Sequence, residues 1–380
     1  MSTLKLNNKS LNSGIATIGI IGGIVSGFGV LVPFYIDKFN LDIEIGGRLF
    51  ALTGFSGIIG VALTSYLLDK IPGKIAGILG ILFTCIGIII LTIAGTWNNI
   101  LIGVVFIGAG FGASQAGISQ LVVDVGGLEA ARRSNKNNIS FAVSSILVPI
   151  IFGLLLNKFY QEMFLVFSIA CLVIAYVFFK NTQGQLFHKP ESEHKGQNHN
   201  LTIVLLLLGI STYVGVESAL TGWIPTFLQD KGWSSSKASF GLSVFFLVIL
   251  VVRLFVLKYL HKLNFGLLTI ISVICLIPAL FLMYTSSLYW VAIVLLGIAC
   301  SPIFPMAFAW VIDISPGNAR ITGFIFFSSI SGSMIFPYLI GSYMNQYGTQ
   351  YAPLFMMVPS VLALLFFLSG YRTTIQKLVK

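Results

Sequence analysis

The chain is dominated by long apolar runs separated by short polar segments. Each run has about 20 residues, the length that a helix needs to cross a hydrocarbon core of roughly 30 Å. The runs lack the strict apolar–polar alternation that is typical of strands in a membrane barrel. Because lipid offers the backbone no hydrogen-bond partners, each run is expected to be helical. The pattern therefore predicts an all-α membrane protein.

Hydropathy predicts twelve membrane spans and one polar interruption. The spans are residues 13–35, 46–69, 74–95, 98–121, 137–157, 161–180, 201–226, 237–259, 265–283, 287–311, 321–343 and 351–370. The interruption, NTQGQLFHKPESEHKGQNHN at 181–200, is typical of a solvated linker on the cytoplasmic side. The prediction is therefore an N-terminal six-helix bundle over 1–180 and a C-terminal six-helix bundle over 201–380.

Composition supports a membrane protein and changes how the charge is interpreted. Hydrophobic residues make up 56% of the chain and charged residues 9%, whereas soluble domains average about 25% charged. The net charge of +10 would suit a nucleic-acid partner, but most Lys and Arg lie in alternate loops. That asymmetry orients membrane proteins and predicts that both termini are cytoplasmic. We therefore expect the partners to be the bilayer and a small solute, with no nucleic acid, and we expect a monomer.

The first run is a full span without a small-residue cleavage site, so we expect it to be retained in the cytoplasmic membrane and not removed as a signal peptide. The four cysteines all lie in apolar runs. Reduced packing residues are expected there, and neither disulfides nor a metal site.

An internal repeat relates the two halves. VPIIFGLLLNKF and FPYLIGSYMNQY share a Pro, a Gly four residues later and an Asn eight residues later, at an offset of 188 residues. The matched residues are Pro149, Gly153, Asn157 and Pro337, Gly341, Asn345. With a slightly larger offset, VPFYIDK of the first span is similar to IPTFLQDK of the seventh. Two halves in the same orientation form a parallel repeat, which predicts a central cavity that opens to one side at a time.

The loop SYLLDKIPGK resembles the signature cytoplasmic loop of the major facilitator superfamily, and that resemblance extends over essentially the whole chain. It implies two pseudo-symmetric six-helix bundles. It also implies that Asp69, with Lys70 and Lys74, forms part of an inner gate, where a carboxylate can bind a helix N-terminus or a basic partner. Ordinary solvated loop charges are the alternative.

Within that superfamily, YVGVESALTGWIPTFL, VVRLFVLKYL and GIACSPIFPMAFAWVID resemble segments of the fucose permease and related sugar–proton symporters. The resemblance implies symport of a sugar-like solute. The sequence departs from the pattern in its first half, where those relatives carry carboxylates. Residues 13–35 contain no acid, and Gln115 stands where a Glu is expected.

Glu217 is an acid inside the span 201–226, beyond its middle. An ionisable group at that depth costs a few kcal/mol and tends to be functional. The first-half counterpart is near Val25, so the scaffold does not require an acid there. We predict that Glu217 is the proton-coupling residue or hydrogen-bonds a polar solute. The alternative is a protonated side chain that fixes helix packing.

The candidates for solute binding are polar or aromatic side chains in the predicted spans. Rings with a polar tip suit amphipathic solutes, although they also pack cores and mark membrane interfaces. The prolines of SPIFP free backbone carbonyls that can line a cavity, or simply bend the helix. The candidates are Ser114, Gln115, Ser119, Asn138, Tyr213, Trp223, Ser301 and Phe304.

Arg253 is the other charge well inside a span. A helix rise of about 1.5 Å per residue places it about 10 Å nearer the cytoplasm than Glu217. We therefore predict a structural or gating pair with Asp313 and not a direct pair with Glu217. Snorkelling to the interface is the alternative.

Several function classes are disfavoured by what the sequence lacks. All four histidines lie in polar segments, so no imidazole is placed to activate a membrane-embedded nucleophile, and we predict that the protein is not an enzyme. No GxxxxGK[ST] motif occurs, which disfavours ATP-driven transport. We predict a secondary transporter without a cofactor, coupled to protons and importing a small polar solute. The alternative is proton-driven efflux of an amphipathic metabolite or drug.

Overall fold

The computed structural model describes residues 8–67, 73–123, 127–182, 200–259, 264–315 and 319–378, and within these ranges all regular structure is helical. The first part of the chain contains α1 (Asn8–Ser26), α2 (Phe28–Phe39), α3 (Ile43–Leu67), α4 (Gly73–Ile93), α5 (Trp97–Val123), α6 (Gly127–Leu155) and α7 (Tyr160–Asn181). The second contains α8 (Asn200–Asp230), α9 (Ser235–Tyr259), α10 (Phe265–Thr285), α11 (Tyr289–Ile314), α12 (Ala319–Tyr347), the short η2 (Thr349–Tyr351) and α13 (Ala352–Leu378).

The helices have the lengths and surfaces of membrane spans. In the described ranges, eleven segments are long and apolar enough to cross a bilayer, with α1 and α2 together forming one of them, and the apolar part of α6, Ile139–Leu155, is shorter. Large apolar side chains are exposed along outer helix faces, such as Leu165, Val173 and Phe179 on α7. Such faces are expected to meet lipid. The predicted all-helical membrane fold is confirmed.

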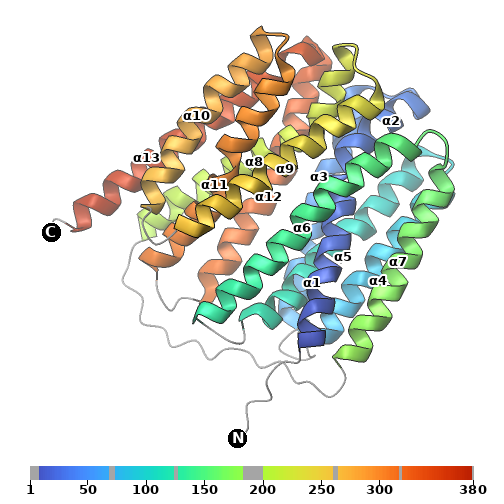
Figure 1. The fold of residues 1–380 in the computed structure, drawn as a ribbon, viewed down its shortest axis with the longest axis horizontal. Helices are drawn as coiled ribbons and strands as arrows, with labels where there is room; N and C mark the ends of the chain where they lie inside the picture. Colours follow the sequence, from blue (N-terminus) through green and yellow to red (C-terminus); the bar gives the residue numbers. More distant parts are fainter. Residues whose placement is uncertain are drawn as a thin grey trace, which may run out of the picture. The chain divides into compact units, whose positions relative to one another are not determined.

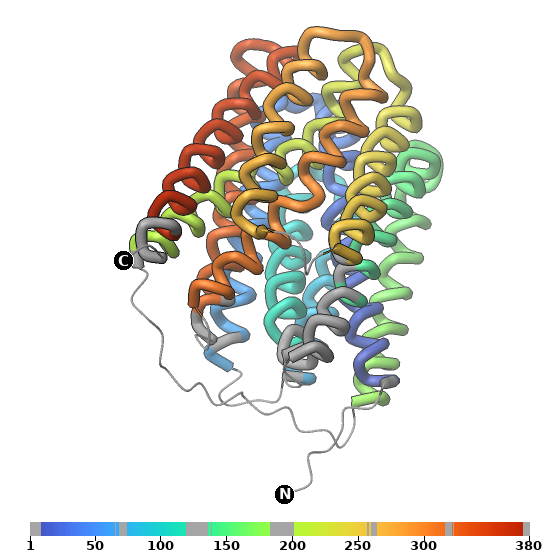
Figure 2. Tube along the Cα trace, turned by 60° about the vertical axis from the view of Figure 1, so that its left-hand side comes forward, coloured from blue at the N-terminus to red at the C-terminus, as the bar shows by residue number. Residues whose placement is uncertain are grey.

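The chain divides into two compact units. Unit 1 comprises Met1–Asn40 and Leu52–Glu191, and unit 2 comprises Leu41–Ala51 and Ser192–Lys380. In unit 1, α4 packs against α5 and α7, and α1 packs against α6 (Figure 1). In unit 2, α10 packs against α11 and α13, and α8 packs against α12 (Figure 2). The helix pairings thus recur in the order that the internal repeat predicts.

Glycines allow the helix backbones of unit 1 to approach closely. A Cβ atom at Gly87 in α4 would lie only 2.5 Å from the carbonyl oxygen of Gly103 in α5. A Cβ atom at Gly23 in α1 would lie 2.8 Å from the side chain of Val148 in α6. Such small-residue contacts are how membrane helices associate when no hydrophobic driving force acts between them.

Several helix bounds differ from the hydropathy prediction. The predicted span 13–35 is broken at Gly27, which lies against the ring of Phe152. The helix predicted to begin at 137 begins at Gly127, and the helix predicted to end at 226 continues to Asp230. Hydropathy detects only the part of a helix that suits lipid, so polar extensions escape it. The predicted linker 181–200 lies almost entirely outside the described residues.

Candidate functional site

Glu217 lies near the middle of α8 among side chains that are almost fully buried. Tyr213, Val216 and Leu220 are at most 1% exposed, whereas Glu217 keeps an intermediate exposure. Glu217 is therefore shielded from most of the solvent, although the residue as a whole is not fully buried.

Three helices supply the groups that act on Glu217. Arg253 on α9 and the Tyr213 hydroxyl on α8 interact with the Glu217 carboxyl, and the carboxyl in turn acts electrostatically on the Cys300 thiol of α11. The Nε of Arg253 is buried and has no hydrogen-bond partner among the described residues. Glu217 is the acid on which this guanidinium is described as acting.

The prediction that Arg253 does not pair directly with Glu217 stays a prediction, because the interaction described between them is electrostatic and no ion pair joins them within the described ranges. Asp313, the predicted partner, is exposed, and no ion pair with Arg253 occurs within the described ranges.

Two candidates for solute contact instead tie helices together. The Tyr213 hydroxyl donates to the carbonyl of Cys300 across 2.7 Å, from α8 to α11. The Ser301 hydroxyl, also buried, donates to the carbonyl of Ile249 across 2.8 Å, from α11 to α9. Both bonds end on backbone carbonyls, so neither partner could be identified from residue types in the sequence.

Trp223 is fully buried in unit 2. Its indole Nε1 donates to the carbonyl of Pro337 on α12 across 2.8 Å. Its ring meets Phe50 of α3 edge-on, at 5.6 Å between centroids. Gly341 lies against the ring, since a Cβ there would come within 2.5 Å of it. The repeated Pro–Gly–Asn motif therefore forms part of the packing around this indole.

The polar candidates of unit 1 are arranged differently. Ser114 is buried at the contact of α5 with α4, beside Gly80, and its hydroxyl has no partner among the described residues. Gln115 on α5 is partly exposed. Ser119 and Asn138 lie in α5 and α6, and their side chains fall outside the described part. Asn138 does not open its helix, because α6 begins at Gly127.

Asn137 was not among the predicted site residues. Its Oδ1 atom is buried and has no hydrogen-bond partner within the described part of the chain. An unsatisfied buried amide oxygen is costly and requires an explanation. Its position next to Asn138 in a polar stretch of α6 is the signal that could have identified it.

Of the three candidates in the predicted inner gate, Asp69 and Lys70 lie outside the described residues. The Lys74 ammonium, in the first turn of α4, donates to the carbonyl of Thr182 across 3.3 Å. Thr182 follows the last residue of α7. A cation at a helix C-terminus satisfies its free carbonyls and its dipole, so Lys74 caps α7 in this conformation.

Helix α11 continues through both Pro302 and Pro305. Each proline nevertheless removes one donor from the helical ladder, so this stretch depends more on side-chain bonds such as that of Ser301. Phe304 between the prolines is partly exposed, with its ring 6.1 Å from that of Phe308.

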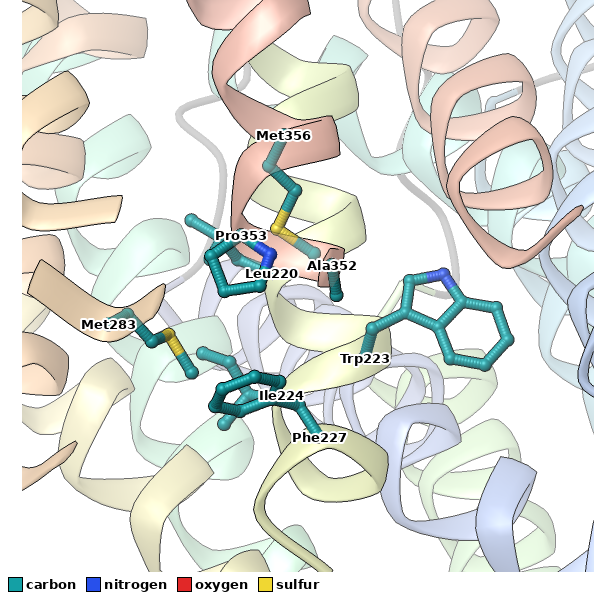
Figure 3. A pocket seen from close by; sticks show the side chains of 8 residues that line it. All are labelled: Leu220, Trp223, Ile224, Phe227, Met283, Ala352, Pro353 and Met356. Atoms are coloured by element: carbon teal, nitrogen blue, oxygen red, sulfur yellow. The ribbon is translucent and has the colours of Figure 1, made fainter. Parts of the chain in front are cut away.

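An apolar recess lies apart from these polar groups, between α8, α10 and α13 (Figure 3). It is too narrow to hold even a water molecule. The Trp223 indole at its edge points away from the other lining side chains. The lining residues are Leu220, Trp223, Ile224, Phe227, Met283, Ala352, Pro353 and Met356. Such a lining suits packing and offers nothing to bind a polar solute.

Bilayer-length helices in two repeated units, with ionisable groups placed inside the spans, define a membrane transporter and not an enzyme. The model of the family described as Major Facilitator Superfamily matches residues 15–294. The chain therefore belongs to the major facilitator superfamily.

The chain is also similar to individual proteins. It is 23% identical over 218 residues to a protein described as a TsgA homolog from Buchnera aphidicola subsp. Schizaphis graminum, and the match covers 55% of each chain. Among solved structures, a bacterial homolog of the human lysosomal transporter Spinster, in an inward-facing and unoccupied conformation, has a TM-score of 0.77 at 14% identity, with 99% of both chains covered. The nucleoside transporter NupG has a TM-score of 0.76 at 14% identity, covering 96% of this chain and 100% of its own. These structures share the fold.

Proposed function

We propose that this transporter is a proton-coupled symporter of a small polar solute, and that Glu217 carries the coupling proton. The observation that supports the proposal most is the setting of Glu217. It is an acid in mid-helix, partly exposed amid buried neighbours and within electrostatic reach of Arg253. The resemblance to the fucose permease group favours a sugar-like solute.

The proposed coupling uses the two charge states of one carboxyl group. Ionised Glu217 attracts the Arg253 guanidinium, and protonated Glu217 does not. Proton binding therefore changes the free-energy difference between conformations that hold the two groups together and those that separate them. If the solute prefers one of these conformations, solute and proton affinities become linked. Gln115 and Phe304, which keep exposed surface in their own units, are the proposed solute contacts.

The distribution of Lys and Arg supports placing the protein in the cytoplasmic membrane with both termini on the cytoplasmic side. Import is then movement toward the side on which the linker 181–200 is predicted to lie.

The experiment begins with purified protein and a panel of sugars and other polar solutes, screened for thermal stabilisation, because a bound ligand raises apparent stability. The stabilising solute is then tested in proteoliposomes with an imposed pH gradient, and we expect accumulation with the proton gradient. In Glu217→Gln, accumulation should fall to the level of protein-free liposomes, while solute counterflow continues because exchange needs no net proton movement.

The matched control is Glu162→Gln, the same change at an exposed acid in the first turn of α7, which should accumulate solute normally. Gradient-driven accumulation by Glu217→Gln would refute the assignment of the proton site. Solute movement against the proton gradient would instead identify an exporter.

A further inference from the structure

The hydroxyl group of Tyr213 has two possible acceptors on different helices. It donates to the Cys300 carbonyl of α11 across 2.7 Å, and the carboxyl of Glu217, one turn later on α8, is close enough to interact with it. The ring is 1% exposed, so little water is available to complete the hydrogen bonding of this group.

The Tyr213 hydroxyl has a single proton, so it cannot donate to the Cys300 carbonyl and to the Glu217 carboxyl at the same time. A phenol has one O–H donor, while a carboxylate is an acceptor only and a protonated carboxyl has one donor of its own. When Glu217 is protonated, it can donate to the Tyr213 oxygen, and Tyr213 donates to Cys300. When Glu217 is ionised, the carboxylate competes for the Tyr213 proton, and a charge-assisted bond is the stronger of the two.

We propose that Tyr213 is a positioning residue that passes the protonation state of Glu217 to α11 by moving its one hydrogen bond between the Glu217 carboxylate and the Cys300 carbonyl. The inference rests on the proposed function, in that Glu217 must gain and lose a proton during transport. It gives Tyr213 a role other than solute contact.

Helix α11 is suited to respond because its own ladder is weakened beside Cys300. Pro302 and Pro305 lack N–H groups, so two carbonyls of the preceding turns lose their helical donors. The bonds from Tyr213 of α8 and from Ser301 to Ile249 of α9 hold this stretch. Loss of the Tyr213 bond leaves the attachment to α9 and releases the one to α8.

The other titratable and charged groups facing Glu217 are Arg253 from α9 and the Cys300 thiol from α11. Arg253 favours the ionised carboxyl and therefore the state in which Tyr213 leaves Cys300. The thiol does not compete for this role, because the acceptor on Cys300 is its backbone carbonyl.

The test is hydrogen exchange at residues 298–306 of the full-length protein at one acidic and one alkaline pH, corrected for the chemical exchange rate. In the wild type, we expect protection to be about fivefold to tenfold higher at acidic pH, the equilibrium equivalent of one ordinary hydrogen bond. Tyr213→Phe should lose the difference and stay at the alkaline level. Glu217→Gln should also lose it but stay at the acidic level, because a neutral amide can donate to Tyr213.

Two controls separate this bond from general packing. Tyr35→Phe removes another buried hydroxyl, which bonds to Tyr160 within unit 1, and should leave α11 unchanged. Cys300→Ala should keep the pH dependence because the backbone acceptor remains.

The outcomes distinguish the two proposals. If Tyr213→Phe keeps the wild-type pH difference while Glu217→Gln loses it, the role of Tyr213 is wrong and the proton site stands. If Glu217→Gln keeps the difference, the proton site itself is wrong. A second measurement leaves Tyr213 unsubstituted. It is the infrared difference spectrum of protein with ring-labelled tyrosine, recorded between the two pH values. A phenol band should shift in the wild type and not in Glu217→Gln, and absence of the shift in the wild type would also overturn the proposal.

Discussion

The first spans of the two halves are counterparts in the repeat, yet they are built with different chemistry. In unit 1 the span is broken into α1 and α2 at Gly27, and α1 meets α6 through glycines and a Ser26–Ser145 hydroxyl pair at 2.7 Å. In unit 2, α8 runs unbroken from Asn200 to Asp230 and carries the acid. The position matching Glu217 is Val25.

The comparison shows that the architecture does not need a carboxyl group at this depth. Both spans pack against their counterpart partners, α1 on α6 and α8 on α12, although only one of them contains an acid. The surroundings differ accordingly, since the position that matches Arg253 at the repeat offset is Ser65. An acid with a nearby countercharge is thus a feature of unit 2, which supports a functional interpretation of Glu217.

The largest effect is expected from placing an acid in unit 1. Val25→Glu should destabilise the protein by about 2.5–3.5 kcal/mol, the cost of an unpaired acid near a helix centre on insertion scales. The effect should shrink as the pH falls, because a protonated carboxyl is easier to bury than an ionised one. Thermal unfolding of the purified protein over a pH series measures both.

Val25→Gln is the control for that experiment, since it adds a polar group that does not titrate and its effect should not depend on pH. Wild-type stability of Val25→Glu at neutral pH would show that unit 1 accommodates an acid as well as unit 2 does.

A smaller effect is expected from the glycine beneath Trp223. Gly341→Ala brings a methyl group to 2.5 Å from the indole and should destabilise unit 2 by about 1–3 kcal/mol through overpacking. The position matching Trp223 in unit 1 is Leu31. Adding Trp223→Leu should therefore relieve the clash. The double variant should lose less stability than the sum of the losses in the two single variants.

Gly323→Ala in the same helix has no atom within 4 Å of the new methyl group and should leave the melting temperature unchanged. Strict additivity in the double variant would mean that the indole and Gly341 do not constrain one another.

The smallest effect is expected from the serine pair of unit 1. Hydrogen bonds between membrane helices average about 0.6 kcal/mol, so Ser26→Ala with Ser145→Ala should cost little stability. Each hydroxyl also lies 2.9 Å from a carbonyl of its own helix. Removing both hydroxyls together leaves no serine hydroxyl facing a missing partner. Transport assays on the double variant should show normal proton coupling. Lost coupling would place polar chemistry in unit 1 as well.

The sequence predicted the helices well because the bilayer imposes strong constraints. Runs of bilayer length must be helical, and the repeat of Pro149, Gly153 and Asn157 predicted how the halves correspond. The break at Gly27 and the early start of α6 at Gly127 were missed. Hydropathy cannot detect an interruption at a single glycine within an apolar run, nor a helix that continues in polar sequence.

The site was less predictable because its partners are mostly backbone atoms or long side chains. Glu217 was identified from the cost of an acid in a span. The carbonyls of Cys300 and Pro337, which accept from Tyr213 and Trp223, have no signature in residue type.

The assignment of Leu41–Ala51 to unit 2 matters for anyone who splits the gene. These residues begin α3, and Phe50 contacts Trp223 while the Glu44 carboxylate accepts from the Tyr338 hydroxyl at 3.4 Å. A fragment that starts after the linker would be produced without them, leaving the indole uncovered on that side. Co-expressed halves should therefore recover more folded protein than the C-terminal fragment translated alone.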